Sequence, residues 1–180
     1  MKNLVNYVLV ALVAFLLGVF LAPSGRFTKA VKSKMKNNRF AAQKLYQKWD
    51  TGSLSFYDGG SFDDFRSKNE RFAIYFWATW CPHCENIKDT IQELDISKLQ
   101  LIGMTFDRDK DVFEQYRSET PYFWHDLVKT SGGNWDFVER AEQYKIPLIP
   151  SVWIIERGKV KKVFVGEAGI KKLPAYLEKL

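Results

Sequence analysis

Residues 72–84 have the sequence FAIYFWATWCPHC, and this segment decides the interpretation of the whole chain. Its first half is an almost continuous apolar run, which is typical of a β-strand buried on both faces. Residues 85–96 have the apolar spacing of a helix, so a strand passes into a helix near Cys81. The unpaired backbone N–H groups and the dipole at a helix start stabilise a thiolate. Cys81 is therefore predicted to be a reactive thiol.

The two cysteines of the chain, Cys81 and Cys84, have the CxxC spacing of a redox pair or a metal pair. The sequence has no second cysteine pair or histidine cluster that would complete a four-ligand zinc site. Glu85 follows Cys84, where a c-type haem attachment site has histidine. A thiolate with a second thiol within reach performs thiol–disulfide exchange. In that chemistry a partly exposed Cys81 attacks, and a shielded Cys84 resolves the mixed disulfide.

Charge is divided unevenly along the 180 residues. Residues 1–49 contain nine of the 27 Lys and Arg and no acidic residue, whereas residues 50–180 contain the other 18 together with all 21 Asp and Glu. A domain that binds nucleic acid keeps its basic patch on the fold. The split therefore argues against nucleic-acid binding.

The N-terminal residues 1–22 are predicted to be a membrane anchor or a signal segment. Residues 4–22 carry no charge and are long enough to cross a hydrocarbon core as a helix. The apolar run is longer than that of a typical signal peptide, which favours an uncleaved anchor. Basic residues follow the span, and the positive-inside rule would keep the rest of the chain in the cytoplasm. The cysteine pair favours the opposite side, so both orientations stay open.

Residues 23–52 are predicted to be a basic stem between the anchor and the domain. Apolar residues recur there at roughly helical spacing with lysines between them: Phe27, Val31, Met35, Ala42, Leu45 and Trp49. One interpretation is an amphipathic helix lying on anionic lipid headgroups. A solvated basic linker is the other.

Residues 53–180 have the pattern of an α/β domain. Strands are predicted at 72–77, 99–106, 152–156 and 160–165, and helices at 85–96, 110–119, 135–144 and 170–179. The acidic residues at 107–109 can cap the helix at 110–119. Residues 120–134 are predicted to be a loop. Strands that alternate with helices and end in a hairpin indicate a mixed sheet with helices on both faces.

FWATWCPHC at residues 76–84 resembles the active-site signature of the thioredoxin superfamily. Residues 54–180 as a whole resemble the TlpA/ResA-like membrane-anchored thiol–disulfide oxidoreductases of bacteria, with supporting motifs LIGMTFD at 101–107, AEQYKIPLIPS at 141–151 and VWIIERG at 152–158. The resemblance implies a thioredoxin-like fold, a central mixed sheet flanked by helices, preceded by an N-terminal transmembrane helix. It also implies an enzyme at the bacterial inner membrane, with its domain facing the periplasm or the cell exterior, that exchanges disulfides with exported proteins or a partner redox protein. No organic cofactor is implied.

The resemblance also assigns residues around the cysteines. Pro150 matches the cis-proline of the family, whose loop faces the cysteine pair and positions the substrate. Ile149 would supply a backbone edge for the substrate. Trp80 and Pro82 would line the substrate site, and Trp77 would either wall the site or belong to the core.

His83 is the residue predicted to tune the redox reaction. The dipeptide Pro82-His83 is similar to that of DsbA, the bacterial disulfide-forming oxidant. A histidine in the first helical turn can give a hydrogen bond or partial positive charge to the Cys81 sulfur, and a stabilised thiolate makes the disulfide a stronger oxidant. A solvated His83 without that contact is the alternative.

Two departures from the family bear on the direction of the reaction. Thioredoxin has a buried aspartate where this chain has Tyr75, and ResA-like proteins have a glutamate where it has Ile87. Both acids are thought to move the proton of the resolving thiol, so Cys84 is predicted to be a slow nucleophile. This favours donation of a disulfide. The alternatives are a specialised reductase, for example in cytochrome c maturation, and a copper-handling protein that binds Cu(I) through CxxC.

Overall fold

The structure of the protein is a computed structural model that describes residues 39–49, 52, 54–95, 97, 99–129 and 148–180. All of these residues belong to the unit Asn38–Leu180. The predicted anchor, most of the predicted stem and the predicted helix at 135–144 lie outside the described residues.

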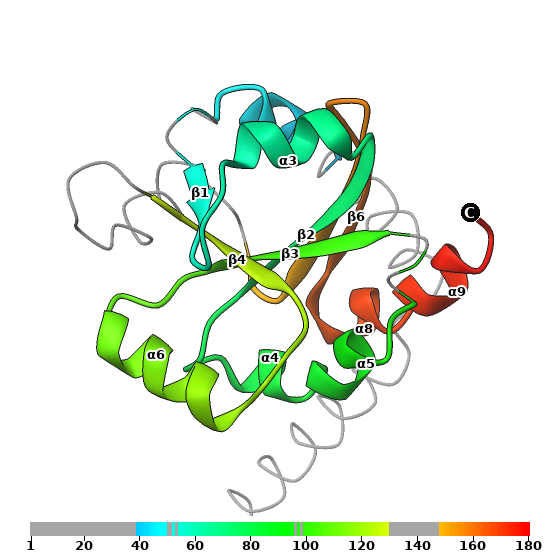
Figure 1. Cartoon of the computed structure of the whole chain (residues 1–180). Helices are drawn as coiled ribbons and strands as arrows, with labels where there is room; N and C mark the ends of the chain where they lie inside the picture. The colour runs from blue at the N-terminus through cyan, green and yellow to red at the C-terminus, as the bar shows by residue number, and fades with distance from the viewer. Residues whose placement is uncertain (1–38, 50–51, 53, 96, 98, 130–147) are drawn as a thin grey trace, which may run out of the picture. The chain divides into compact units, whose positions relative to one another are not determined.

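The described residues form a mixed six-stranded sheet in the order β1-β4-β3-β2-β5-β6 (Figure 1). The strands are β1 (Leu54–Phe56), β2 (Arg71–Trp77), β3 (Gln100–Thr105), β4 (His125–Lys129), β5 (Ser151–Glu156) and β6 (Lys159–Val165). The central strands β2, β3 and β4 are parallel, whereas β1, β5 and β6 each run antiparallel to their neighbours. The predicted mixed sheet is confirmed.

Strand β2 lies in the middle of this sheet and is buried on both faces. Its side chains alternate between two hydrophobic clusters, with Ala73, Tyr75 and Trp77 in one and Phe72, Ile74 and Phe76 in the other. Each of the six is at most 2% exposed. Burial of one large apolar side chain contributes about 1.5–3 kcal/mol. The continuous apolar run therefore made β2 a central strand.

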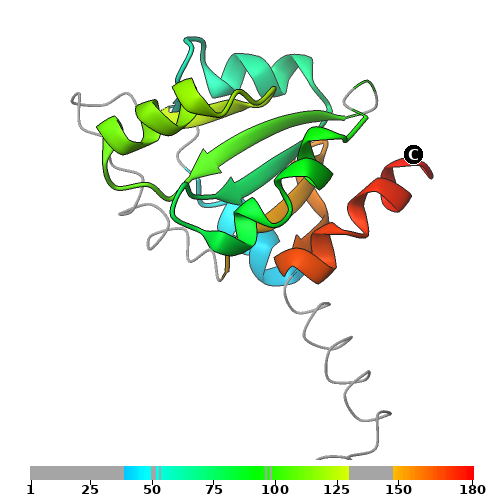
Figure 2. The same cartoon turned by 90° about the horizontal axis from the view of Figure 1, so that it is seen from below.

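Helices cover both faces of the sheet (Figures 1 and 2). They are α3 (Phe62–Lys68), α4 (Pro82–Glu85), α5 (Lys88–Gln92), α6 (Lys110–Glu119), α8 (Gly166–Ile170) and α9 (Leu173–Leu177), and residues 39–46 are also helical. The cluster that contains Tyr75 receives side chains from α4, α5, α6, α8 and α9. The other cluster receives side chains from residues 39–46 and α3.

The predicted helices differ from the observed ones mainly at their starts and breaks. The helix at 110–119 is confirmed, with the Asp109 side chain accepting hydrogen bonds from the backbone N–H groups of Asp111 and Val112. The predicted helix at 85–96 is wrong in extent, because α4 already starts at Pro82 and a break at residues 86–87 separates it from α5. The predicted helix at 170–179 is likewise two short helices, α8 and α9.

Three elements were not predicted. Strand β1 and helix α3 precede β2, and β4 lies inside the predicted loop at 120–134. Both β1 and β4 are short, so their apolar alternation is too brief to be recognised. Strands β4 and β1 extend the sheet on the far side of β3.

The predicted stem overlaps the folded unit. Ala42, Tyr46 and Trp49 are buried against the sheet, and Leu45 packs beside them. The boundary predicted at residue 53 is therefore wrong, since the unit begins at Asn38. Helical spacing of apolar residues indicates an apolar face, but not whether a membrane or a protein core covers it.

Among the helices of the described ranges, none is long and apolar enough to cross a membrane. The span predicted at residues 4–22 lies outside those ranges.

Gly103 offers a test of how tightly the sheet and its buried side chains fit. A Cβ atom at this β3 position would lie 2.0 Å from Asp126 Oδ1 and 2.7 Å from Trp124 Cδ1. We expect Gly103→Ala to reduce the free energy of unfolding by about 1–3 kcal/mol or more, because both neighbours are buried and would have to move. Urea denaturation measures the change.

Gly169→Ala is the matched control. Gly169 lies in α8, where alanine is the better helix former, and a Cβ atom there would be 3.4 Å from the nearest atom, the backbone carbon of Phe164. We expect no loss of stability. Equal losses in the two variants would contradict the tight fit at Gly103.

Candidate active site

Cys81 and Cys84 form a disulfide at the start of α4, with their Cα atoms 5.2 Å apart. The residues are 5% and 4% exposed. The prediction of a partly exposed Cys81 is therefore wrong for this disulfide-bonded state. The reason is that the Cys81 sulfur turns inward, toward Cys84, and accepts a hydrogen bond from the Cys84 N–H at 3.2 Å.

That hydrogen bond makes Cys81 the N-cap of α4. The predicted junction of a buried strand and a helix start is confirmed: three residues separate Cys81 from the end of β2. A backbone N–H directed at sulfur favours the thiolate once the disulfide opens. Cys81 is thus the better leaving and attacking group of the pair.

The turn before Cys81 is fixed by a buried carboxylate. Asp107, which follows β3 and is 2% exposed, accepts hydrogen bonds from the Thr79 N–H at 3.1 Å and from Thr79 Oγ1 at 2.6 Å. The next residue, Trp80, is 62% exposed. Its large apolar surface beside the disulfide fits the predicted contact with a substrate, whereas Trp77 belongs to the core.

The loop before β5 lies at the same end of the sheet as the disulfide. Strand β5 begins at Ser151, which pairs with Phe76 near the end of the antiparallel β2. The peptide bond between Ile149 and Pro150 is cis, as predicted. Ile149 is half-buried against both clusters, and Leu148 is exposed. The elements that carry Pro150 and Cys81 therefore meet at one edge.

His83 contacts a residue to which no sequence pattern pointed. Its Nδ1 lies 2.6 Å from Oε1 of Glu167 in α8, and the Asn86 side-chain amide donates to the same oxygen at 3.1 Å. These contacts hold the pKa of Glu167 below its usual value, Asn86 being the larger cause. The tuning role of His83 stays a prediction, but its ring has a carboxylate partner.

Tyr75 and Ile87, the two positions where the resemblance leads one to expect an acid, are buried and non-acidic. Ile87 is fully buried, and Tyr75 borders a cavity of about 10 Å³ together with Cys84, Glu85 and Tyr116. Such a cavity has room for about one water molecule. Burial raises the pKa of Tyr75 and that of Tyr116, the latter to about 12, while Lys88 lowers the pKa of Glu85. At neutral pH these groups are weak proton acceptors for Cys84.

A buried carboxylate lies elsewhere in the same sheet, at Asp126 of β4. It accepts hydrogen bonds from Trp77 Nε1 at 2.9 Å and from the Tyr122 hydroxyl at 2.6 Å, and Arg117 Nη1 is 3.7 Å away. Complete burial raises its pKa to about 6. Gly103, between Tyr75 and Asp126 in the register, leaves the space that the carboxylate occupies.

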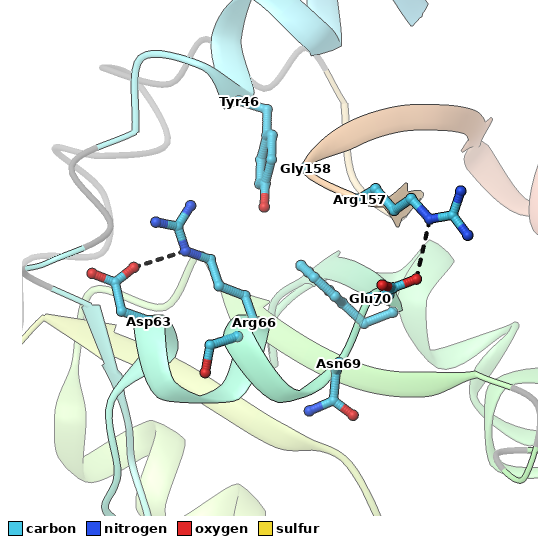
Figure 3. Close-up of a pocket in the computed structure, with 9 residues that line it drawn as sticks. Tyr46, Asp63, Arg66, Asn69, Glu70, Arg157 and Gly158 are labelled. Carbon is cyan, nitrogen blue, oxygen red and sulfur yellow. Dashed lines mark hydrogen bonds and ion pairs between the residues drawn. The ribbon is translucent and has the colours of Figure 1, made fainter.

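A second, larger hollow has no connection with the predicted site residues (Figure 3). It has a volume of about 410 Å³ and lies over α3 and the turn between β5 and β6. Two ion pairs line it, Arg66–Asp63 at 2.8 Å and Arg157–Glu70 at 3.1 Å. Phe72, at the start of β2, borders it, whereas the disulfide follows the end of that strand.

The described part of the chain has no cluster of three or more His, Cys, Asp or Glu side chains that could hold a metal ion.

Comparison with known families identifies the fold. Residues 55–121 match the sequence model of the family described as Thioredoxin. The domain has the thioredoxin fold. With a CxxC disulfide at a helix start and a cis-proline at the same edge of the sheet, the site is that of a thiol–disulfide oxidoreductase.

Solved structures agree on this fold. StoA from Bacillus subtilis has a TM-score of 0.53 at 16% identity, over 69% of this chain and 96% of its own. A thio-disulfide isomerase from Thermus thermophilus has a TM-score of 0.55 at 20% identity, over 70% and 89%. An exposed lipoprotein thioredoxin from Streptococcus pneumoniae has a TM-score of 0.51 at 22% identity, over 71% and 97%. No curated protein sequence matches the chain.

Asp126 makes stability depend on pH. Its pKa of about 6 lies above the ordinary value of 3.8, so between pH 4 and 6 the folded state holds a proton that the unfolded chain releases. This preferential protonation of the folded state adds up to about 3 kcal/mol to the free energy of unfolding below pH 4, and the gain is lost as the pH rises through 6. We expect Asp126→Asn to flatten the unfolding free energy between pH 4 and 7, measured by urea denaturation.

The control is Asp64→Asn, which changes an exposed aspartate of α3. The comparison uses the difference between each variant and the parent chain, since other acids titrate in the same range. If Asp126→Asn keeps the pH slope of the parent chain, the raised pKa of Asp126 is wrong.

Proposed function

We propose that this chain donates its Cys81–Cys84 disulfide to cysteine-containing exported proteins or to a partner redox protein. The observation that carries the direction is the surroundings of Cys84, where a pair of tyrosines, Ile87 and an ionised Glu85 stand in place of a buried acid. In the proposal His83 tunes the potential, Pro150 positions the substrate, and Trp80, Pro82 and Ile149 contact it.

The reaction proceeds through a mixed disulfide. A substrate thiolate attacks the Cys81 sulfur, and the bond to Cys84 breaks with its electron pair going to the Cys84 sulfur. A second substrate thiolate then attacks the first substrate sulfur and releases the Cys81 thiolate. The substrate dithiol is oxidised to a disulfide, the CxxC pair gains two electrons, and the substrate thiols give up two protons.

A poorly activated Cys84 favours this direction. The Cys84 thiolate can attack the mixed disulfide and return the substrate unoxidised. Once Cys84 is protonated, that reverse step needs a group that removes its proton. The tyrosines at the cavity hold their protons at neutral pH, and Lys88 stabilises Glu85 as a carboxylate. The mixed disulfide therefore lasts long enough for the second substrate thiol to react.

The proposal places the enzyme at the bacterial inner membrane through residues 1–22, with the domain facing the periplasm or the cell exterior. The resemblance to TlpA/ResA-like enzymes supports this location. A fold neighbour is named as an exposed lipoprotein thioredoxin in Streptococcus pneumoniae. A reporter fused after Leu180 that works only in the cytoplasm would contradict the placement.

The reduction potential tests the direction. We expect a value nearer to that of DsbA, about −120 mV, than to that of thioredoxin, about −270 mV, because a helix-start N–H stabilises the Cys81 thiolate. Equilibration with glutathione redox buffers, followed by thiol alkylation and mass measurement, gives the value. A potential near −270 mV would favour the specialised reductase. Tight stoichiometric Cu(I) binding without disulfide turnover would favour the copper-handling protein.

Trapping of mixed disulfides tests the roles of the two cysteines. We expect Cys84→Ala to accumulate mixed disulfides through Cys81, since no resolving sulfur remains. Non-reducing gels followed by mass spectrometry identify the trapped proteins. Cys81→Ala is the control and should trap none, because Cys84 lacks the helix-start N–H contact that stabilises a thiolate at Cys81. Equal trapping by both variants, or by neither, would contradict the assignment.

A further inference from the structure

We propose that Glu167 is a positioning residue of the active site, one that holds His83 and limits the positive charge that this ring presents to the Cys81 sulfur. The inference rests on the proposed disulfide exchange and concerns its potential. It assigns a role to a residue of α8, which follows Cys84 by more than 80 positions in the sequence.

Glu167 lies between the cis-proline loop and helix α4, the two elements that make up the site. The preceding residue, Gly166, donates its N–H to the Pro150 carbonyl at 2.8 Å. Gly166 has a φ of 65°, so it takes a left-handed backbone conformation as the chain turns from β6 into α8. Two consecutive residues therefore contact the cis-proline loop and helix α4, respectively.

One carboxylate oxygen of Glu167 contacts two polar side chains, those of His83 in α4 and of Asn86 at its C-cap. Oε1 lies 2.6 Å from His83 Nδ1 and 3.1 Å from the amide nitrogen of Asn86. The Asn86 amide fixes the carboxylate, and the carboxylate fixes the imidazole ring. Because Nδ1 is engaged in this way, the ring has only Nε2 left for a hydrogen bond to Cys81. The Glu167 side chain is 27% exposed and the His83 side chain 68% exposed, so the carboxylate end of the contact is the shielded one and solvent reaches the ring.

The carboxylate also changes the net charge near the disulfide. An imidazolium next to a carboxylate forms a neutral pair, whose potential falls off faster with distance than that of a single cation. Lys171, also near Glu167, is the other cation that acts on this carboxylate. The Cys81 thiolate therefore receives less stabilisation than a CPHC motif with an unpaired histidine would give. Glu167 makes the disulfide a weaker oxidant than its motif alone predicts.

Glu167→Gln tests the charge while keeping the shape of the side chain. The amide oxygen of glutamine can still accept hydrogen bonds from Asn86 and His83, so the change removes mainly the negative charge. We expect the equilibrium constant with glutathione to shift about 3- to 10-fold toward the reduced enzyme, where tenfold corresponds to about 30 mV. We also expect the pKa of the Cys81 thiol to fall, as measured by thiolate absorbance in the reduced protein.

Glu178→Gln is the matched control, since Glu178 is an exposed glutamate beyond α9. It should leave the equilibrium constant unchanged. Thermal unfolding of each variant shows that the fold is intact.

A double-mutant cycle with His83→Gln separates positioning from a general charge effect. If Glu167 acts through His83, the shift caused by Glu167→Gln becomes much smaller in the His83→Gln background. An equal shift in both backgrounds, or none in the first, would overturn the inference. Failure of the parent chain to equilibrate with glutathione at all would instead refute the proposed function.

Discussion

Burial of β2 on both faces is the constraint on which the active site depends. The strand is central in the sheet, and its side chains enter both hydrophobic clusters. Its position is therefore determined by packing on two sides and by hydrogen bonds to β3 and β5. Since Cys81 comes only four positions after Trp77, the packing of β2 also fixes the position of the Cys81 sulfur. A reactive group held at the end of a packed strand needs little reorganisation when a substrate arrives.

Buried carboxylates complete the positioning that apolar packing begins. Asp107 holds the turn at Thr79 directly before the cysteines, and Asp126 holds the Trp77 indole at the end of β2. A buried carboxylate is costly unless donors satisfy it, and both have such donors. The cost remains visible at Asp126, whose pKa is raised. The domain thus has a buried acid in register with Tyr75, two strands away across Gly103, and this acid anchors an indole and a tyrosine hydroxyl.

The sequence predicts the local parts of this architecture well and the remote contacts poorly. The strand, the cysteine pair and the cis-proline could be recognised because each lies within a short motif of specific composition. The packing of residues 39–49 against the sheet could not be predicted, since an apolar helical face has the same spacing whether it meets a membrane or a protein core. The partner of His83 could not either, because it comes from α8, far along the chain. Contacts of that kind depend on tertiary packing and leave no periodic signal.

Helix α8 connects the helix that carries the disulfide with the cis-proline loop. Its first residue supports the Pro150 carbonyl and its second engages His83. Ile170 and neighbouring Leu173 anchor this segment in the cluster that also contains both cysteines. Gly166 and Glu167 thus join the Pro150 loop to helix α4 through one peptide unit. In the proposed mechanism, a substrate bound at the loop would therefore act on the same peptide unit that positions Glu167.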